Sequence, residues 1–401
     1  MTSVPRCLGV FFDENIMKTS RFRLLISGGL LGALFVASSF SSLRADDSPQ
    51  ILSIDHYLRV KSTVPAIAGQ QAQIYVRERV QAGMALRAQA FTDRVVLFVH
   101  GAGTPAEVSF DAPAPGYSWM AYLAAAGYDV FSVDQTGYGR STRPPQMNDP
   151  CNLAADKQAQ FIGSLLQAPC KPAYPSAMTT IQSDWDEIGA AVDYIRSLRR
   201  VEKVHMVAWS LGGPRSGGYA AKHPEKVGKL VWLAPAYGRT SAAAPPAKVP
   251  ADGTVFNTQS RAEFIANWDR QVGCPGQYEP AVADSIWAAM LESDPVGATW
   301  GPAVRRAPQT TTWGWNNAVV SKMQIPALMV AAAHDKQVDP ARVRELYDDY
   351  GSSQKVMIDL GCASHAAMWD KVRTSLFRAS LEWIEKGTVD GKQNGIIKLG
   401  Y

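Results

Sequence analysis

Runs of apolar residues long enough to form buried strands recur along this chain, and most of them precede a segment with helical periodicity. The run Arg94–His100 (RVVLFVH) is apolar at every interior position, as expected of a strand buried on both faces. Further strands are expected at Asp129–Asp134, Lys203–Trp209, Val227–Leu233, Ile325–Ala332 and Lys355–Leu360. Helices are expected at Tyr117–Ala126, from an N-cap at Asp184 to Arg200, and at Leu211–Lys222, Pro340–Tyr350 and about Ala366–Lys386, before a polar tail. Strands that alternate with helices predict an α/β fold with a mostly parallel, doubly wound sheet.

Three features modify this pattern. Ile54–Val64 and Gln73–Val80 alternate in polarity and predict an antiparallel hairpin at a sheet edge. Residues 141–182 are rich in proline, and residues 238–324 hold two amphipathic helical patterns. Long insertions after strands of an α/β sheet are usually lids or binding elements. We therefore expect a core of residues 46–237 and 325–401, with residues 238–324 inserted as a helical cap.

The first 45 residues have the layout of a secretory signal. Leu24–Phe40 is apolar and is followed by small residues at plausible cleavage points, and Met17 is a possible true start. The basic residues before the apolar run are Lys18, Arg21 and Arg23. The alternative is an uncleaved membrane anchor, for which the apolar run is short. The sequence thus predicts export to the periplasm or the medium, with no stable membrane anchor after cleavage.

The charge balance argues against a nucleic-acid partner. The formal net charge is +4, from 40 basic and 36 acidic residues. Residues 1–45 carry five basic and two acidic side chains, which leaves 35 − 34 = +1 for the remainder. A nucleic-acid-binding protein normally keeps a basic face in its folded part. The sequence does not indicate an oligomeric state.

The cysteines remaining after signal removal are even in number, and they are Cys151, Cys170, Cys274 and Cys362. In an oxidising compartment this favours two disulfides, with three possible pairings. Pairing Cys151 with Cys170 would close a loop in the proline-rich insertion, and pairing Cys274 with Cys362 would tie the cap to the core. The alternative is four unpaired buried thiols. No zinc-ligand spacing is present, so no metal site is expected.

Ser210 lies between a predicted strand and a predicted helix, with small residues two positions before and after it (Ala208 and Gly212). A tight turn that exposes a serine between a strand and a helix needs small residues at those positions. The alternative role for Ser210 is that of an ordinary helix N-cap.

His100-Gly101-Ala102-Gly103 follows the strand ending at Val99, and such a turn can aim a backbone N–H at a developing oxyanion. We assign the backbone N–H groups of Ala102 and Leu211 to an oxyanion hole, and we expect the His100 side chain to be structural. The stretch from Asp134 to Ser141 (DQTGYGRS) is expected to be structural, with Gln135 or Tyr138 as pocket residues. It lacks the third glycine of a dinucleotide motif, so no cofactor is expected.

A serine hydroxyl becomes an effective nucleophile when a histidine, oriented by a carboxylate, removes its proton. Of the six histidines, only His365 lies in a loop just beyond the last predicted core strand. Together the loop HGAG, the strand end DQTGYGRS, the elbow AWSLGG, a late aspartate and this histidine resemble the α/β-hydrolase superfamily, in particular its secreted serine esterases and lipases. The resemblance implies Ser210 as nucleophile, Asp335 as acid and His365 as general base.

Two departures from the family pattern concern this site. Ala208 replaces the usual first glycine of the elbow, and Ala332 stands where a glycine often precedes the acid loop. Members of the family place the acid after a strand that follows the nucleophile, where Asp335 and Asp339 both qualify. Asp339 precedes Pro340, which is the pattern of a helix N-cap followed by proline at the first helical position. Asp335 is therefore the expected acid.

The expected function is that of an exported serine hydrolase, which cleaves a small-molecule or polymeric carboxylic ester through an acyl-enzyme. A serine nucleophile argues against relatives that open haloalkanes or epoxides. A lactonase, peptidase or perhydrolase of the same fold and a non-catalytic binding protein remain as alternatives. Tryptophans are frequent around the cap, and aromatic walls suit apolar substrates. The candidate aromatic substrate contacts are Trp209, Trp313 and Trp315.

Overall fold

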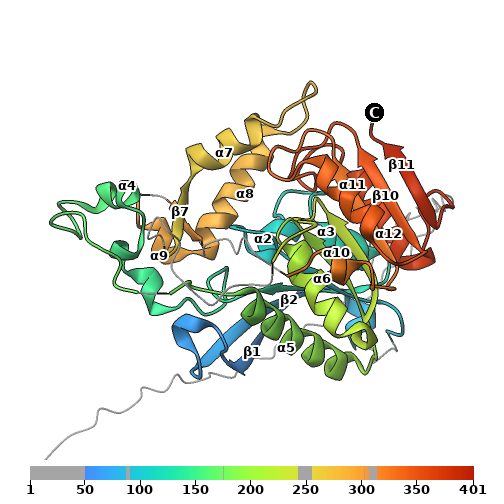
Figure 1. The fold of residues 1–401 in the computed structure, drawn as a ribbon, viewed down its shortest axis with the longest axis horizontal. Coiled ribbons are helices and arrows are strands. Elements are labelled where there is room, and N and C mark those ends of the chain that lie inside the picture. The colour runs from blue at the N-terminus through green and yellow to red at the C-terminus, as the bar shows by residue number, and fades with distance from the viewer. Residues whose placement is uncertain (1–49, 87–90, 175, 243–254, 302, 307–313) are drawn as a thin grey trace, which may run out of the picture. The chain divides into compact units, whose positions relative to one another are not determined.

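The core of the described chain is a mixed sheet of nine strands (Figure 1). The strands lie in the order β1-β2-β4-β3-β5-β6-β9-β10-β11. The computed structural model describes residues 50–86, 91–174, 176–242, 255–301, 303–306 and 314–401, and the structural statements below refer to these. β2 runs antiparallel to both of its neighbours, and the other strands are parallel. The strands are β1 (Ile51–Lys61), β2 (Gln71–Gln81), β3 (Val95–Val99), β4 (Asp129–Asp134), β5 (Val204–Trp209), β6 (Val227–Leu233), β9 (Ala327–Ala332), β10 (Lys355–Leu360) and β11 (Asn394–Leu399).

Helices cover both faces of the sheet, which explains why the central strands are mostly apolar and buried. Side chains alternate along β3, so that Val96 and Phe98 join one hydrophobic cluster while Val95, Leu97 and Val99 join the other. The helices on one face are α5 (Ile181–Arg199), α6 (Gly212–Lys222) and α11 (Pro340–Asp349), and those on the other are α2 (Ala106–Phe110), α3 (Trp119–Ala125) and α12 (Arg373–Lys386). The predicted α/β class with a mostly parallel, doubly wound sheet is confirmed.

The start of α5 differs from the prediction. Thr180, not Asp184, is the N-cap: its hydroxyl accepts a hydrogen bond from the backbone N–H of Ser183, whose side chain in turn accepts from Thr180 N. Asp184 is a buried residue within the helix and forms an ion pair with Arg215 of α6 at 2.8 Å. An acidic residue near a helix start can cap the helix or form an ion pair. The capping pattern predicted the first role for Asp184, whereas the structure shows the second.

The C-terminal segment also differs. α12 begins at Arg373 instead of about Ala366, and the expected polar tail forms β11, which pairs in parallel with β10. The longest apolar run of β11 is Ile396 and Ile397, between Gly395 and Lys398, and Leu399 ends the strand. A run of two apolar residues is too short to predict a strand. At the edge of the sheet the segment nevertheless forms one, because β10 supplies the backbone hydrogen bonds.

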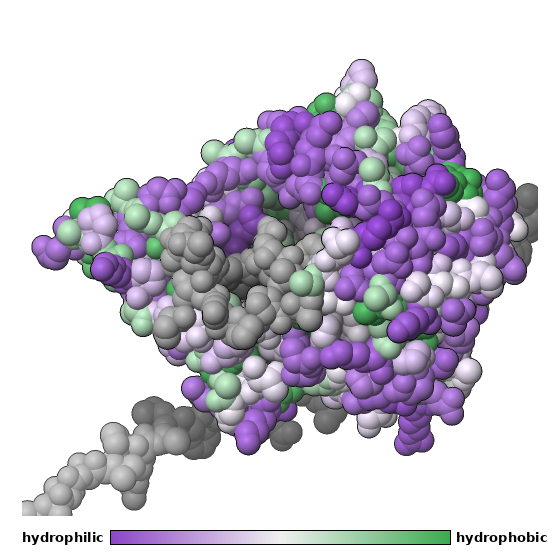
Figure 2. Space-filling model, in the orientation of Figure 1, coloured by the Kyte–Doolittle hydropathy of each residue, from purple (hydrophilic) through white to green (hydrophobic). Residues whose placement is uncertain are grey.

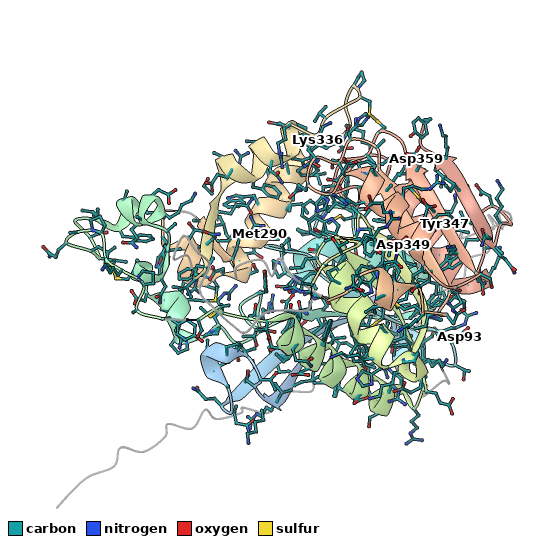
Figure 3. The ribbon with its side chains drawn as sticks, viewed as in Figure 1. Asp93, Met290, Lys336, Tyr347, Asp349 and Asp359 are labelled. Carbon is teal, nitrogen blue, oxygen red and sulfur yellow. A yellow bond between two sulfur atoms is a disulfide. The ribbon has the colours of Figure 1, made fainter. Side chains whose placement is uncertain are left out.

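The described part of the inserted segment 238–324 contributes a small sheet and four helices, of which α7, α8 and α9 lie near the carboxyl ends of the parallel strands (Figure 1). These elements are β7 (Asn257–Ser260), α7 (Arg261–Asp269), α8 (Pro280–Ser293), α9 (Pro295–Ala298) and β8 (Ala303–Arg306), and the short helix α10 (Asn317–Val320) leads back to β9. The predicted helical patterns of the cap thus correspond to α7 and α8. Met290 of α8 is fully buried against the core (Figure 3).

The proline-rich insertion packs against this segment. Met147 and Phe161 from the first insertion share a hydrophobic cluster with Phe256 and Trp300 from the second. Arg305 of β8 donates a hydrogen bond to the carbonyl of Met147 at 3.1 Å. The disulfide Cys151–Cys170 closes the first insertion on itself. Both insertions therefore cover the edge of the sheet at the carboxyl ends of its parallel strands.

The surface face seen in Figure 2 is mostly hydrophilic, and its hydrophobic residues are scattered. In the part of the chain that the structure describes, no helix is both long and apolar enough to cross a membrane. The predicted signal segment, residues 1–45, lies outside the described residues.

Candidate active site

The turn between β5 and α6 holds Ser210 in a strained conformation. Ser210 has a φ of 58°, in the left-handed region that non-glycine residues rarely adopt. Its backbone N–H donates to the carbonyl of Leu233 at 3.0 Å. A Cβ added to Gly212 would lie 2.5 Å from the carbonyl oxygen of Val99, so glycine is required there. Neighbouring strands thus fix a turn that places the serine at the carboxyl edge of the sheet.

The glycine-rich loop after β3 lies beside this turn, because β3 and β5 are adjacent parallel strands. Arg215 holds the loop from below by donating to the carbonyls of His100 at 3.2 Å and Gly101 at 3.0 Å. Burial and the nearby Arg215 keep the pKa of His100 well below its usual value, so its imidazole is neutral. His100 is completely buried and accepts from the backbone N–H of Gln135. Its side chain is structural in this arrangement, as expected.

The loops after β9 and β10 bring an acid and a base together. Nδ1 of His365 lies 2.6 Å from Oδ2 of Asp335, and both residues are buried. The other oxygen of Asp335 accepts from the backbone N–H groups of Gln337 at 2.7 Å and Val338 at 2.9 Å. Asp339 instead accepts from Ala341 N at 2.9 Å and caps α11. The two aspartates therefore lie in separate environments: Asp335 faces His365, and Asp339 caps α11.

Gln271, which follows α7, connects the acid loop and the histidine loop to the cap. Its side-chain oxygen accepts from the backbone N–H of His365 at 3.0 Å and from that of Lys336 at 3.2 Å. Figure 3 shows Lys336 close to the end of α7. One cap side chain thus holds the residue next to Asp335 and the backbone of His365 at the same time. Sequence reasoning missed Gln271, because a single glutamine after a helix carries no distinguishing pattern.

Asp370 also binds the backbone of the histidine loop. Its carboxylate accepts from the backbone N–H of Ser364 at 2.6 Å and from the indole N–H of Trp268 at 2.9 Å. Burial is the main reason why the pKa of Asp370 is raised to about 6. The histidine loop is therefore attached to the cap through hydrogen bonds at His365 and at Asp370.

A cavity of about 490 Å³ opens at this point. Ser210 and His365 both line it, together with Ala102 and Leu211, the two residues assigned to an oxyanion hole. Its aromatic walls are Trp209, Phe264, Trp268 and Trp369, and its polar lining includes Asn267, Gln271, Arg306, Asp339 and Arg342. A serine, a paired histidine and two candidate backbone donors thus share one cavity of the size of a small-molecule site.

Of the candidate substrate contacts in the described residues, Trp209 lines the cavity and the others do not. Trp315 is buried in the opposite core, with its ring 5.2 Å from that of Trp232. Gln135 and Tyr138 are buried behind the glycine-rich loop and are not part of the cavity lining, and the Tyr138 ring packs 4.5 Å from that of His100. Aromatic content cannot distinguish a wall from a core residue, which is why Trp315 was misplaced. Trp313 lies outside the described residues.

A second disulfide, Cys274–Cys362, joins the loop after α7 to the histidine loop. Cys274 is three positions beyond Gln271 and Cys362 three before His365. The double variant Cys274→Ala/Cys362→Ala is expected to lose about 2–4 kcal/mol of unfolding free energy and to lower kcat, because the histidine loop loses its covalent attachment. Cys151→Ala/Cys170→Ala is the matched control, expected to lose stability while keeping kcat. Equal effects on kcat, or four alkylatable thiols in unreduced protein, would contradict the account.

Buried carboxyl groups near the site make stability depend on pH. Burial raises the pKa of Asp134 to about 7, with Glu107 adding to the shift, and burial raises that of Glu187 to about 7. Unfolded carboxyls titrate near 4, so from about pH 4 to 7 the folded state holds more protons and loses stability as pH rises. We expect Tm to be a few degrees higher at pH 5.5 than at pH 8. Glu187→Gln should flatten this dependence in differential scanning calorimetry, whereas a Tm that increases up to pH 8 would refute it.

Comparisons with known proteins agree with this architecture. The family model described as alpha/beta hydrolase fold matches residues 94–372. A 2-hydroxy-6-oxononadienedioate/2-hydroxy-6-oxononatrienedioate hydrolase of Cupriavidus pinatubonensis (strain JMP 134 / LMG 1197) is 26% identical over 201 residues. That alignment covers 48% of this chain and 57% of the relative, so it spans little more than half of the relative's length.

Similar solved structures include a thermophilic esterase from Thermogutta terrifontis, at 14% identity and a TM-score of 0.49, covering 83% of this chain and 99% of that one. A serine hydrolase from Cycloclasticus zankles has 14% identity and a TM-score of 0.47, covering 83% and 98%. The family model alone extends from the start of β3 past His365, over more than half of the 401 residues. The chain belongs to the α/β-hydrolase fold family.

Proposed function

We propose that this chain is an exported serine hydrolase that cleaves a carboxylic ester through an acyl-enzyme formed on Ser210. The observation that carries the proposal is the shared cavity: Ser210 on its strained turn and His365, hydrogen-bonded to Asp335 at 2.6 Å, line the same space. Export rests on the leader pattern in the sequence and is supported by the two disulfides.

Acylation would begin when the Ser210 hydroxyl attacks the ester carbonyl and its proton passes to Nε2 of His365. Asp335, which faces Nδ1, would hold the imidazole in the required tautomer and stabilise the imidazolium. The backbone N–H groups of Ala102 and Leu211 would donate to the tetrahedral oxyanion. His365 would then return the proton to the departing alcohol oxygen and leave the acyl group on Ser210.

Deacylation would follow the same path with water in place of the serine. His365 would remove a proton from water, the resulting hydroxide would attack the acyl carbonyl, and the proton would return to the Ser210 oxygen as the acid leaves. The aromatic walls formed by Trp209, Phe264, Trp268 and Trp369 suit an apolar part of the substrate.

The test is a substrate panel on the wild-type protein and the Ser210→Ala variant. It comprises p-nitrophenyl esters of graded chain length, a lactone series, aminoacyl p-nitroanilides and a peracid-formation assay. We expect hydrolysis of at least one ester class that disappears in Ser210→Ala. Turnover confined to lactones or anilides would move the protein to the corresponding alternative, and no turnover in any assay would refute the proposal.

A further inference from the structure

One charged side chain in the active-site cavity has no role in the proposed chemistry. Arg306 is the last residue of β8 and lines the cavity together with Ser210, Ala102 and His365. Its neighbour Arg305 forms an ion pair with Asp294 at 2.6 Å, at a buried position. Adjacent residues of a strand point to opposite faces. Arg305 therefore points into the interior of the cap, while Arg306 faces the cavity.

The guanidinium of Arg306 lacks an acidic partner in the described part of the chain. Its hydrogen bond is to the carbonyl oxygen of Ala102, at 3.2 Å from Nη2. The other cavity arginine, Arg342, has Glu345 at 2.9 Å. Glu263, whose charge acts on Arg306, is bonded to Lys157 and to the backbone of Ser260. Arg306 thus keeps donor capacity that the described carboxylates do not use.

Arg306 is half-buried, and the partial removal of its charge from water is costly without an anion. Desolvation lowers the pKa of Arg306, but a guanidinium stays protonated at any pH at which a protein is folded. A charged group removed from water is stable only when a charge or several hydrogen bonds compensate it. A guanidinium that offers parallel N–H donors matches a carboxylate better than any neutral acceptor.

The backbone beside Arg306 is shaped to admit the guanidinium. Gly103 has a φ of +82°, and a Cβ added to it would lie 1.8 Å from Nε and Nη2 of Arg306. The space that a side chain at position 103 would fill is thus occupied by the charged group. Glycine at position 103 therefore allows the loop to adopt a positive φ and leaves space for the Arg306 side chain to pack against the loop.

The distance to the nucleophile limits the ligand. A Cβ on Gly101 would lie 2.8 Å from Cβ of Ser210, and Gly103 is two residues further along the same loop. Two residues span at most about 7 Å, so the guanidinium is roughly one short aliphatic chain away from Ser210. A carboxylate three to five bonds from the scissile carbonyl would fit this separation.

We infer that Arg306, seated on Gly103, forms an anion subsite that selects substrates carrying a free carboxylate close to the scissile ester. This inference rests on the proposed function and names the substrate class of the same site. The monoesters of short dicarboxylic acids are the simplest members of that class. The bidentate contact would hold the carboxylate while the ester carbonyl lies between Ser210 and the backbone donors.

A matched pair of esters tests the subsite. Mono-p-nitrophenyl adipate and p-nitrophenyl hexanoate have the same number of acyl carbons and differ in a terminal carboxylate against a methyl group. We expect wild-type protein to favour the adipate ester by about 10- to 100-fold in kcat/KM, the range of a charge-assisted hydrogen bond. A second pair, 4-carboxyphenyl butyrate and phenyl butyrate, places the carboxylate on the alcohol side and shows which side faces Arg306.

Arg306→Gln should reduce the preference in the favoured pair to within about threefold. Lys336→Gln is the control, since it removes one positive charge from an exposed side chain beside the cavity that is not part of its lining. It should leave the preference as in wild type. An unchanged preference in Arg306→Gln, no preference in wild type for either pair, or an equal loss on charged and neutral esters would overturn the inference.

A binding measurement separates this inference from the proposed function. Adipate dianion should bind the Ser210→Ala protein in isothermal titration calorimetry, and Arg306→Gln in the same background should weaken that binding at least tenfold. Binding lost with Arg306 while the wild type hydrolyses no ester would uphold the subsite and refute the ester hydrolase. Ester hydrolysis with neither adipate binding nor an ester preference that depends on Arg306 would uphold the ester hydrolase and refute the subsite.

Discussion

Asp335→Asn is expected to lower kcat by about 10³- to 10⁴-fold while the protein stays folded. The introduced amide oxygen can still accept from Gln337 N and Val338 N, so the loop should keep its shape. The amide nitrogen would then face Nδ1 of His365, now 2.6 Å from a carboxylate oxygen. A donor in that place favours the tautomer that carries its proton on Nε2, and this tautomer cannot accept the proton of Ser210. Steady-state kinetics on the best ester of the panel, with circular dichroism for folding, measure the effect.

Asp339→Asn is the matched control, because Asp339 also lines the cavity but caps α11. Asparagine caps a helix about as well as aspartate, so this variant should keep most of its activity and its Tm. If Asp339→Asn were the inactive variant and Asp335→Asn the active one, the assignment of acid and cap would be reversed.

Ser210→Ala should lower kcat by about 10⁴- to 10⁶-fold, the size of loss seen when a serine nucleophile is removed from such a triad. The variant should be about as stable as wild type, because alanine has the same strain at a φ of 58°. Ser210→Gly should be equally inactive and more stable by about 0–1.5 kcal/mol. Glycine removes about 1–2 kcal/mol of left-handed strain and costs about 0.5–1 kcal/mol in chain entropy.

Thermal melts of the three proteins measure the difference between the relieved strain and the entropy cost of glycine. A Ser210→Gly variant clearly less stable than Ser210→Ala would mean that the strain at this turn is smaller than that cost. Residual activity above about one hundredth of wild type in either variant would mean that another group carries the nucleophilic step.

Local patterns in the sequence were sufficient for the parallel strands from β3 to β10, although not for β11. β3 is a continuous apolar run because it is buried on both faces, and β4 and β10 have the predicted bounds. The small residues around Ser210 reflect close backbone approach, which restricts residue type directly. The separate environments of Asp335 and Asp339 could be predicted because an aspartate directly before a proline is typical of a helix start.

Features that depend on contacts between distant segments could not be predicted in the same way. Gln271 holds two loops that lie more than 60 residues away in the sequence, and nothing in its neighbourhood marks it. Arg306 differs from Arg305 only in the direction that β8 gives each side chain. Trp315 belongs to the core because α6 and β6 surround it, and its sequence context resembles that of a cavity residue. Each of these roles is set by packing partners that the linear sequence does not reveal.

The nucleophilic role of Ser210 is tested most directly by covalent labelling. Wild-type protein is treated with a fluorophosphonate probe, and the adduct is located by peptide mapping with tandem mass spectrometry. We expect one adduct, on the peptide that contains Ser210, with labelling slowed strongly in Asp335→Asn and abolished in Ser210→Ala. Failure of the folded wild type to react, an adduct on another residue, or equal labelling of Ser210→Ala would contradict that role.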